Sequence, residues 1–388
     1  MTRRHAETLV VIAPQGIPEK RPRLEKTIRL AASRGWVVEY WGWARTPAEV
    51  CGATMPGVTR SRTLLRGGGY QGLSVRYRYV LWVLRVFFAT IRYRPHAIWA
   101  LGLETALPVW LASKFVGVRY VFDDADRFVL LFNLPGVVRR VITALERCVS
   151  GQAVTHVIPG PGRYDYTSAS MQVVGNVPDS SQIDRAFRTP IDRPDASLVV
   201  YVNGWLAPVR GLRFIEAIAS RLEEDRHIQF LLATKMSGDE GDLLGQLSNV
   251  KLLGSLDQVT ALAYYKVSDL VITFYDPAIA INRYAEPNKW GDAAKMGTAL
   301  LVNEEVRTAD SWVKAGAAFT VPWNDTEAAC ELLRRLAADR SSVEAAIQVV
   351  LQEGLALPSF DDSVTPILER LAAASEAQEL RQHAPSTA

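Results

Sequence analysis

The amino-acid sequence predicts an α/β protein made of two tandem, doubly wound, Rossmann-like domains. In the first half, short runs rich in Val and Ile alternate with longer segments whose apolar residues recur at helical spacing. The alternation begins again near Ser197, after a polar, proline-bearing stretch with little periodicity. Strands that alternate with helices are typical of a parallel sheet covered on both faces. The expected organisation is a first domain over 1–182, a linker over 183–196, a second domain over 197–357, and a segment over 358–388 whose helix packs back toward the first domain before a frayed tail.

The elements expected in the first domain follow from this alternation. The expected strands cover 7–14, 36–43, 96–102, 119–126 and 153–160. The expected helices between them cover 23–33, 74–93, 105–116 and 137–149, where apolar residues recur every three or four positions.

The second domain repeats the pattern and ends in helices. Its expected strands cover 197–204, 228–235, 250–254, 269–276, 298–305 and 317–323, with a helix from Leu212 after the first. Helices are expected near 325–338, 342–353 and 361–380. Doubly wound sheets bind ligands at the carboxyl ends of their strands, so we expect a ligand in the cleft between the two domains.

Composition predicts a folded cytoplasmic protein. Hydrophobic residues make up 48% of the chain and charged residues 22%, which is typical of folded rather than disordered proteins. Cys51, Cys148 and Cys330 lack metal-type spacing, so we expect a reducing compartment and no disulfides. The apolar run near the N-terminus is too short for a signal peptide, and no uninterrupted apolar run approaches the roughly 18 to 20 residues of a spanning helix.

Charge is distributed unevenly along the chain. Residues 1–200 contain 27 Lys and Arg against 15 Asp and Glu, whereas residues 201–388 contain 17 against 26. Between Glu49 and Glu104 there are eight arginines and no carboxylate. This asymmetry predicts that the two halves meet different partners.

The second domain opens with the segment VVYVNGWLAPVRGLRFIEAI. A strand ends at Gly204, and an amphipathic helix begins after Arg210 and Gly211. Glycine lets another group approach the backbone closely. An arginine at the mouth of a strand–loop–helix unit can reach an anion bound at the helix N-terminus. An ordinary turn with a solvated arginine explains the same residues, so both interpretations stay open for this segment by itself.

The stretch EPNKWGDAAKMG (286–297) predicts a helix that begins near Pro287 and ends at Gly297. The free N–H groups at the start of this helix, with Lys289 beside them, form an anion site. Asp292 follows three residues later on the same side of the helix. A cation for phosphate and a carboxylate for sugar hydroxyls suit a nucleotide. The alternative is a Lys–Asp surface pair on a well-capped helix.

The order and spacing of these two segments resemble the GT-B glycosyltransferases of the family-4 type, which are common in bacterial exopolysaccharide and lipopolysaccharide synthesis. The shared pattern is G-x5-R-G-L, followed about 80 residues later by P-N-K-x-x-[E/D]-x4-G and a Val/Leu strand. The resemblance covers most of the chain and includes the segments YVFDDAD and VVGNVPD. It implies the GT-B fold, with a nucleotide-sugar donor bound to the C-terminal domain.

Site residues follow from this resemblance position by position. It implies that Asp292 holds the nucleotide ribose, and that Arg210 and Lys289 neutralise the donor diphosphate with helix amides near Asn288. The expected donor-binding residues are Gly204, Arg210, Gly211, Glu286, Asn288, Lys289 and Asp292.

Three positions depart from the family pattern. Trp205 stands where an arginine often follows the first glycine, and the ribose residue is Asp rather than Glu. Tyr284 occupies the other acidic position of the family's E-x7-E pattern, although Glu286 is close in sequence. These departures bear most directly on contacts with the donor sugar.

The segment YVFDDAD places carboxylates at the end of a strand. Asp124 and Asp126 formally match a D-x-D metal motif, but that motif belongs to glycosyltransferases of a different, single-domain fold, so no metal is expected. The resemblance places this strand end at the cleft, where a carboxylate can orient or deprotonate an acceptor hydroxyl. The alternative for Asp123, Asp124 or Asp126 is a cap on the next helix.

Other residues of the first domain are expected to face the acceptor. Glu104 follows Gly102 at the end of the preceding strand, and Gln15 and Gly16 follow the first strand. The expected acceptor-binding residues are Gln15, Gly16, Glu104, Asp124 and Asp126.

The segment 75–95 mixes arginines with aromatic residues. Arginines at 76, 78, 85, 92 and 94 alternate with tyrosine, tryptophan and phenylalanine. A basic aromatic helix of this kind can lie in an anionic membrane interface. The alternative is a core helix whose arginines reach the surface. Nucleic-acid binding is not expected, because no recognition fold accompanies the segment.

The resemblance implies a glycosyltransferase of the hexosyltransferase class, which moves a sugar from a nucleotide-sugar donor to a glycan or lipid-linked acceptor in bacterial polysaccharide synthesis. The expected catalytic residues are Asp124, Asp126, Arg210 and Lys289. No cofactor is expected, and peripheral attachment to the inner face of the membrane is compatible with the segment 75–95. The resemblance implies retention at the anomeric carbon; the alternatives are inverting transfer by an aspartate base, a nucleotide-sugar epimerase or hydrolase, and a non-catalytic scaffold subunit.

Overall fold

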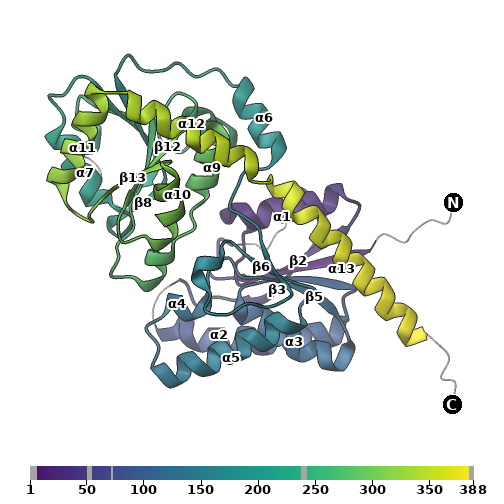
Figure 1. The fold of residues 1–388 in the computed structure, drawn as a ribbon. Coiled ribbons are helices and arrows are strands. Elements are labelled where there is room, and N and C mark those ends of the chain that lie inside the picture. Colours follow the sequence, from purple (N-terminus) through teal and green to yellow (C-terminus); the bar gives the residue numbers. More distant parts are fainter. Residues whose placement is uncertain (1–6, 50–54, 71–72, 237–242, 384–388) are drawn as a thin grey trace. The chain divides into compact units, whose positions relative to one another are not determined.

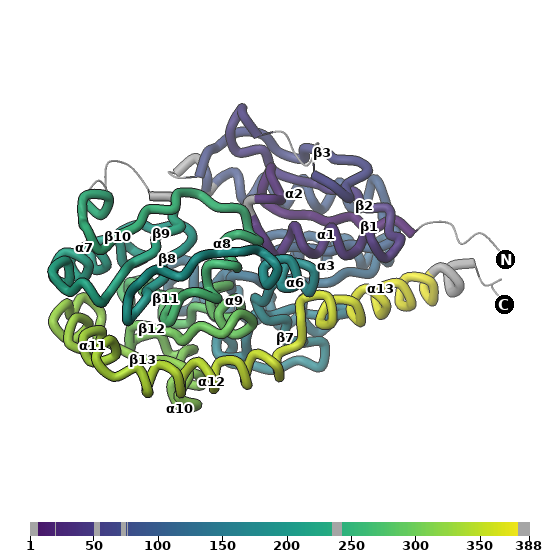
Figure 2. The backbone as a smooth tube through the Cα atoms, turned by 90° about the horizontal axis from the view of Figure 1, so that it is seen from above, coloured from purple at the N-terminus to yellow at the C-terminus, as the bar shows by residue number. Residues whose placement is uncertain are grey.

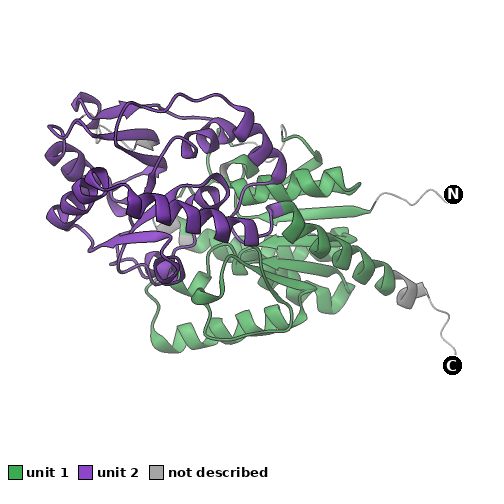
Figure 3. Ribbon diagram, turned by 45° about the horizontal axis from the view of Figure 1, so that its top comes forward, with its two compact units in different colours: residues 1–174, 361–388 green, residues 175–360 purple. Residues whose placement is uncertain are grey.

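The computed structural model describes residues 7–49, 55–70, 73–236 and 243–383. The chain forms two compact units (Figure 3). Unit 1 comprises residues 1–174 and 361–388, and unit 2 comprises residues 175–360. Cys51 lies outside the described residues, and Cys148 and Cys330 are free thiols. Among the described residues, no helix combines the length and the apolarity needed to cross a membrane.

Unit 1 contains a seven-stranded parallel sheet in the order β3-β2-β1-β4-β5-β6-β7. The strands are β1 (Thr8–Ala13), β2 (Val37–Ala44), β3 (Val58–Arg66), β4 (Ala97–Leu101), β5 (Arg119–Asp123), β6 (Thr155–Ile158) and β7 (Met171–Val173). In the centre of the sheet, Val11 of β1 lies opposite Tyr40 of β2 and Trp99 of β4. The central strands are buried on both faces, as expected for a parallel sheet covered by helices.

Helices cover both faces of this sheet. They are α1 (Pro22–Ser33), α2 (Leu73–Tyr93), α3 (Leu103–Val116), α4 (Phe128–Leu131), α5 (Gly136–Gln152) and α13 (Phe360–His383). Figure 1 shows α2, α3 and α5 on one side of the sheet and α1 and α13 on the other. The core under α2 and α3 includes Trp43, Trp82 and Phe122. From α13, the carbonyl of Ser363 accepts a hydrogen bond from Gln172 of β7, which attaches this last helix to the edge of the sheet.

Unit 2 contains a six-stranded parallel sheet in the order β10-β9-β8-β11-β12-β13 (Figure 2). The strands are β8 (Leu198–Leu206), β9 (Ile228–Met236), β10 (Val250–Leu252), β11 (Leu270–Thr273), β12 (Ala299–Asn303) and β13 (Ala318–Val321). The helices are α6 (Ser180–Arg188), α7 (Leu212–Arg221), α8 (Gln258–Tyr265), α9 (Asn288–Met296), α10 (Asp310–Ala315), α11 (Thr326–Ala338) and α12 (Ser341–Ala356). Alternate residues of β8 enter two different cores: Val200 packs with α7 and α11, and Tyr201 packs with α8 and α9.

The prediction of two doubly wound α/β domains is confirmed, but three elements differ from expectation. Strands β3 and β7 lie outside the predicted strands: β3 is an arginine-bearing edge strand, and β7 has only three residues. Helix α6 occupies residues expected to be irregular. Asp179 and Gln182 form reciprocal hydrogen bonds there, a capping box that starts a helix despite the polar composition.

In each sheet the strand order reverses at one place. The reversal lies between β1 and β4 in unit 1 and between β8 and β11 in unit 2. Loops that leave the carboxyl ends of such neighbouring strands run in opposite directions, which makes this edge the usual ligand site of a doubly wound sheet.

Candidate functional sites

In unit 2, Arg210 is held at the carboxyl ends of β8 and β11. A short turn, Pro208–Arg210, connects β8 to α7. The amide of Asp276, just after β11, donates to the carbonyl of Val209 at 3.2 Å. The guanidinium carbon of Arg210 lies 4.5 Å from the centre of the Tyr275 ring. The loops after the two strands therefore fix this cation between them.

Gly211 makes this turn possible. Its φ of 82° lies in the left-handed region, which strongly favours glycine. A side-chain carbon at this position would also lie 2.7 Å from Cβ of Phe274. The glycine that follows Arg210 in the sequence motif is therefore required by the backbone conformation and by the close approach of Phe274.

Helix α9 is fixed in unit 2 by contacts on several sides. Trp290 donates to the hydroxyl of Thr273 at 2.9 Å. The ammonium of Lys295 donates to the carbonyls of Gly354 at 2.7 Å and Leu357 at 2.5 Å. A Cβ at Gly291 would lie 2.3 Å from the carbonyl oxygen of Asn176, so the segment before α6 also packs directly on this helix. Helix α9 is thus attached to β11, to the end of α12 and to the segment before α6.

Lys289 lies on this first turn, close to Arg210. Burial and the positive charge of Arg210 lower the pKa of the Lys289 ammonium to about 8, although the carboxylate of Asp292 acts in the opposite direction. A Cβ at Gly204 would lie 3.8 Å from Cε of Lys289. The structure thus brings Gly204, Arg210 and Lys289 together, at the place where the strand order reverses.

Asp292 lies one turn further along α9 and is only 5% exposed. Burial, and next the negative charge of Asp292, raise the pKa of Tyr201 and of Tyr265. Tyr265 accepts a hydrogen bond from the amide of Asn203, the residue before Gly204, at 3.1 Å. Asp292 therefore belongs to a polar cluster beneath the loop that follows β8.

The remaining donor candidates lie around this cluster. Asn288 is exposed at the start of α9, and the backbone carbonyl of Glu286 accepts from the side chain of Asn176 at 2.5 Å. Of the positions that depart from the family pattern, Trp205 is 55% exposed and the hydroxyl of Tyr284 accepts from Arg307 at 3.1 Å. The sequence analysis did not single out Asn203, Tyr265 and Tyr275. Asn203 lies within β8 and Tyr275 lies two residues after β11, each directly after an apolar run, which is the signal that could have found them.

In unit 1, a pocket of about 220 Å³ lies at the corresponding edge of the other sheet. Its polar lining comes from the segments that follow β1, β2, β3, β4 and β5, and from α2. The polar lining residues are Gln15, Arg21, Arg45, Tyr70, Tyr79, Glu104 and Asp126. Three expected acceptor residues, Gln15, Glu104 and Asp126, therefore share one pocket.

Glu104 has an unusual environment in this pocket. Burial raises the pKa of its carboxyl to about 7, and the negative charge of Asp124 acts in the same direction. A hydrogen bond from its own backbone N–H and the positive charges of Arg21 and Arg45 lower the pKa, but by less. The carboxyl folds back over Gly102, where a Cβ would lie 2.7 Å from Oε2. Gly102 has a φ of 78°, so its conformation and the lack of a side chain both suit this arrangement. At neutral pH the carboxyl is divided between its charged and neutral forms.

The aspartates at the end of β5 have three different environments. Asp123 is fully buried and accepts from Arg23 at 2.9 Å and Trp99 at 3.0 Å, which is a structural arrangement. Asp124 is fully buried, does not line the pocket, and accepts from the hydroxyl of Tyr164 at 2.7 Å. Asp126 lines the pocket and pairs with Arg21 at 3.1 Å. Gly16, also expected here, instead packs against Glu49 and Ala44 and is absent from the lining.

Behind Asp124 lies a buried polar network that sequence reasoning did not find. Arg127 donates to Glu146 at 3.0 Å and to Asp165 at 2.8 Å. Burial, together with the charge of Asp124, raises the pKa of Glu146 to about 7, while Arg127 lowers it. His156 is fully buried, and its Nε2 lies 3.9 Å from Oδ2 of Asp124. The network holds the segments after β5 and β6 together.

The helix that covers the segment 75–95 has two different sides. Trp82, Val86 and Ala89 of α2 are buried in the core of unit 1. Its exposed apolar residues are Tyr77, Val80, Leu81, Leu84, Phe88 and Tyr93. Arg85, Arg92 and Arg94 are also exposed. The side chain of Arg76 lies outside the described residues.

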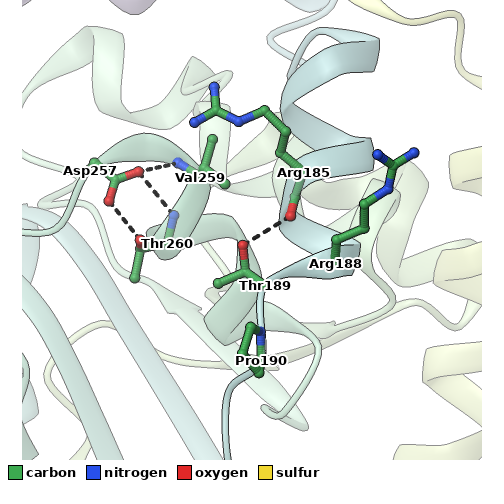
Figure 4. Close-up of a pocket in the computed structure, with 7 residues that line it drawn as sticks. All are labelled: Arg185, Arg188, Thr189, Pro190, Asp257, Val259 and Thr260. Atoms are coloured by element: carbon green, nitrogen blue, oxygen red, sulfur yellow. Dashed lines mark hydrogen bonds between the residues drawn. The ribbon is translucent and has the colours of Figure 1, made fainter.

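Unit 2 has a hollow of about 480 Å³ between the end of α6 and the start of α8 (Figure 4). Asp257 caps α8 by accepting from the amides of Val259 and Thr260. Arg185 and Arg188 of α6 line the same hollow. No residue singled out in the sequence lies there. Among the described residues, no three His, Cys, Asp or Glu side chains are grouped so that they could hold a metal ion.

Comparison with known proteins connects this chain to others through structure. No protein-family model and no curated protein matches the sequence. A glycosyltransferase from Rickettsia africae aligns with 96% of this chain and 99% of its own length, with a TM-score of 0.64 and 11% identity. Anabaena HepE in complex with UDP and glucose aligns over 95% and 100%, with a TM-score of 0.62 and 14% identity. A UDP-N-acetylglucosamine 2-epimerase aligns over 96% and 98%, with a TM-score of 0.60 and 11% identity.

These proteins share the two parallel α/β sheets over nearly their whole length, while their sequences have diverged widely from this one. The chain therefore has the GT-B fold, which in the solved structures serves both glycosyltransferases and UDP-N-acetylglucosamine 2-epimerases.

Proposed function

We propose that this protein is a glycosyltransferase that uses a nucleotide-sugar donor. One observation carries the proposal: Arg210, from the turn after β8, and Lys289, from the first turn of α9, lie together beside Gly204, where the strand order reverses. Two neighbouring cations repel each other, so an arrangement that holds both in a half-buried position suits a ligand with more than one negative charge. A nucleoside diphosphate supplies that charge, and α9 adds the free amides of a helix N-terminus.

The same groups suit the chemistry of sugar transfer. When the bond between the anomeric carbon and the diphosphate oxygen breaks, the leaving diphosphate gains negative charge. Cations fixed beside it stabilise the transition state more than the ground state. In this proposal Arg210 and Lys289 bind the diphosphate, Asp292 and the cluster around it contact the nucleoside, and the pocket of unit 1 receives the acceptor.

Uridine is the base that we propose first, because solved structures of this fold include complexes with UDP. The acceptor in this proposal is a glycan or a lipid-linked sugar of bacterial polysaccharide synthesis. The resemblance to family-4 enzymes favours retention at the anomeric carbon. Analysis of the product's anomeric configuration by NMR distinguishes retention from inversion.

The decisive experiment is UDP binding to the full chain, measured by calorimetry. We expect Arg210→Ala to weaken UDP binding and to lower the transfer rate by about 100-fold or more, which is typical when one contact to developing charge is lost. Arg213→Ala is the matched control, because Arg213 lies on the next turn, is exposed, and pairs with Glu216. Equal UDP affinity in wild type and Arg210→Ala would overturn the proposal.

An epimerase or hydrolase is the second candidate, because the structural neighbours include UDP-N-acetylglucosamine 2-epimerases. Incubation with donor alone separates the two: an epimerase or hydrolase changes the nucleotide sugar without an acceptor, and a transferase does so only slowly. A complete lack of nucleotide binding would instead favour a scaffold subunit, for which Trp205 and Tyr284 are the suggestive departures.

We also propose that unit 1 contacts an anionic membrane through α2. The exposed side of α2 combines large apolar residues with arginines, the composition of helices that lie in a membrane interface. A lipid-linked acceptor would be delivered at such a surface.

A further inference from the structure

Arg45 in the unit 1 pocket is a buried cation surrounded mainly by neutral groups. It is 6% exposed. Its guanidinium donates to the carbonyl of Pro14 at 3.0 Å, to the hydroxyl of Tyr79 at 3.1 Å and to the carbonyl of Gly69 at 3.5 Å. Its Cζ lies 4.0 Å from the centre of the Trp43 ring. Buried charges are normally paired with an opposite charge, because desolvation otherwise destabilises the fold.

The nearby carboxylates do not form that pair. Glu49 accepts from the backbone N–H of Arg45 at 2.8 Å and from the hydroxyl of Tyr70. Within the described ranges, the guanidinium of Arg45 donates its hydrogen bonds to two carbonyls and a tyrosine hydroxyl rather than to a carboxylate. Asp126 pairs with Arg21, the other arginine of the pocket. The pocket therefore has two cations and only one carboxylate in an ion pair with them.

Glu104 decides the charge of the pocket. When its carboxyl is neutral, the charged groups that line the pocket are Arg21, Arg45 and Asp126, so the lining has an excess of one positive charge. When it ionises, the excess charge disappears. The carboxylates of Glu49 and Asp124 are buried behind this lining. The charged and titratable groups that face Glu104 are Asp124, Arg21 and Arg45, and the pocket wall adds Asp126, Tyr70 and Tyr79.

We propose that this pocket binds an anionic oxygen group of the acceptor, a carboxylate or a phosphate, with Arg45 as the principal cation and Arg21 as the second. The acceptor class is then an acidic sugar or a sugar phosphate. Planar guanidinium groups match both oxyanions well. The pocket has a volume of about 220 Å³, which is several times the roughly 30 Å³ that one water molecule occupies. A charged group with part of its sugar therefore fits. Naming the ligand as acceptor rests on the proposed transferase function, whereas anion binding by the pocket does not.

The proposal makes binding depend on pH in one direction. The carboxyl of Glu104 has a pKa of about 7, so it gains a negative charge as the pH rises through neutrality. That charge faces the bound anion and repels it. Anion affinity is therefore highest below pH 7 and falls above it.

The experiment titrates the full chain with glucuronate, glucose and inorganic phosphate, without nucleotide, by calorimetry between pH 6 and 8. We expect glucuronate or phosphate to bind at least 10-fold more tightly than glucose, and the stronger of the two identifies the oxyanion. Glucuronate is the ligand for measuring the pH dependence, because its carboxyl has a normal pKa near 4 and stays ionised over this range. Any change in its affinity then reports a change in the protein. Its affinity in wild type falls between pH 6 and 8.

Three variants test the assignment. Glu104→Gln should bind glucuronate at pH 8 as tightly as wild type does at pH 6, and should lose the pH dependence. Arg45→Gln should lose anion binding, and circular dichroism checks that this variant is folded. Arg140→Gln, on the outer face of α5, is the matched control and should bind as wild type does.

If Arg45→Gln does not fold, Glu104→Gln still tests the proposal. Equal affinities for glucuronate, phosphate and glucose in wild type, or an unchanged pH dependence in Glu104→Gln, would overturn it. Because UDP is absent, that outcome leaves the proposed donor site untouched.

Discussion

At the scale of single residues, the environments of Lys289 and Glu104 shift their pKa values toward neutrality. Burial and Arg210 lower the pKa of Lys289, and burial raises the pKa of Glu104. Both groups lie beside the place where the strand order of their sheet reverses. Strongly perturbed groups in such positions are more often functional than those on an open surface.

The shifted pKa of Lys289 predicts how donor binding depends on pH. The ammonium is charged below its pKa of about 8 and loses its charge as the pH rises through that value. UDP affinity should therefore fall above pH 8, and Lys289→Gln should weaken UDP binding roughly 10- to 100-fold at pH 7, since a hydrogen bond to a charged group contributes about 1.5–3 kcal/mol. Calorimetry at pH 7 and pH 9 measures both effects. Lys314→Gln, an exposed lysine of α10, should behave as wild type, and a flat pH profile in wild type would contradict the assignment.

Gly211 predicts a steric effect on stability. In Gly211→Ala the new Cβ meets Phe274 and the backbone adopts a φ of 82° that alanine disfavours. The free energy of unfolding should fall by about 1–3 kcal/mol from the backbone strain alone, and further from the clash. Gly316→Ala is the control, because its φ is 85° and no atom lies within 4 Å of the new carbon. Urea unfolding should show a larger loss for Gly211→Ala; equal losses would mean that the contact with Phe274 relaxes freely.

At the scale of elements, the position of α9 depends on α12. Lys295 donates to two carbonyls at the end of α12, and a Cβ at Gly354 would lie 1.9 Å from the carbonyl oxygen of Ala294. The two helices therefore pack with their backbones in close contact, which leaves no room for a side chain at this position of α12.

This packing predicts that Gly354→Ala acts on the donor site from a distance. The added methyl group must push α9 away, so unit 2 should lose stability by at least 1–3 kcal/mol and UDP affinity should fall although Gly354 contacts no proposed ligand. Gly151→Ala is the control: Gly151 lies in helix α5 with nothing within 4 Å, so alanine should leave stability unchanged or raise it by up to about 1 kcal/mol. Thermal unfolding with and without UDP measures both quantities. An unaltered UDP affinity in Gly354→Ala would show that α9 does not need this contact.

At the scale of the whole molecule, the basic first half and the acidic second half correspond to different proposed partners. The excess of Lys and Arg over residues 1–200 includes the arginines of α2, whereas in unit 2 the cations Arg210 and Lys289 lie close together at one small site. A long-range field of this kind steers anionic partners toward unit 1.

Membrane binding tests this organisation. The full chain should sediment with vesicles that contain phosphatidylserine and much less with neutral vesicles, and added salt should weaken the binding because exposed charges are screened. The double variant Val80→Glu, Phe88→Glu places carboxylates on the exposed side of α2 and should reduce binding about 10-fold or more. Leu355→Glu is the control, since Leu355 is a highly exposed apolar residue of unit 2. Equal sedimentation with neutral and anionic vesicles would reject the proposed membrane surface.

Local patterns in the sequence were sufficient for most elements and for singling out the residues that lie together near Gly204 in unit 2. Helices with apolar residues at a period of 3.6 are buried on one face, and short strands rich in Val and Ile are buried on both faces. The order of apolar and polar residues along the sequence records this burial directly. Arg210, Gly211 and Lys289 could be singled out because loops at strand ends and helix starts have their own composition. The sequence by itself therefore determined the two-domain α/β class and the segments that carry the unit 2 site.

Only the tertiary structure decided which carboxylates of unit 1 line the pocket. Asp123, Asp124 and Asp126 look equivalent in the segment YVFDDAD, yet only Asp126 lines the pocket. The pocket around Glu104 joins residues from six segments of the chain, and the pKa of its carboxyl depends on that burial. Periodicity indicates which side of one element faces the core. The burial of a given residue, the charges around it and its place in a pocket depend instead on segments that are distant in the sequence. Those segments meet only when the chain folds.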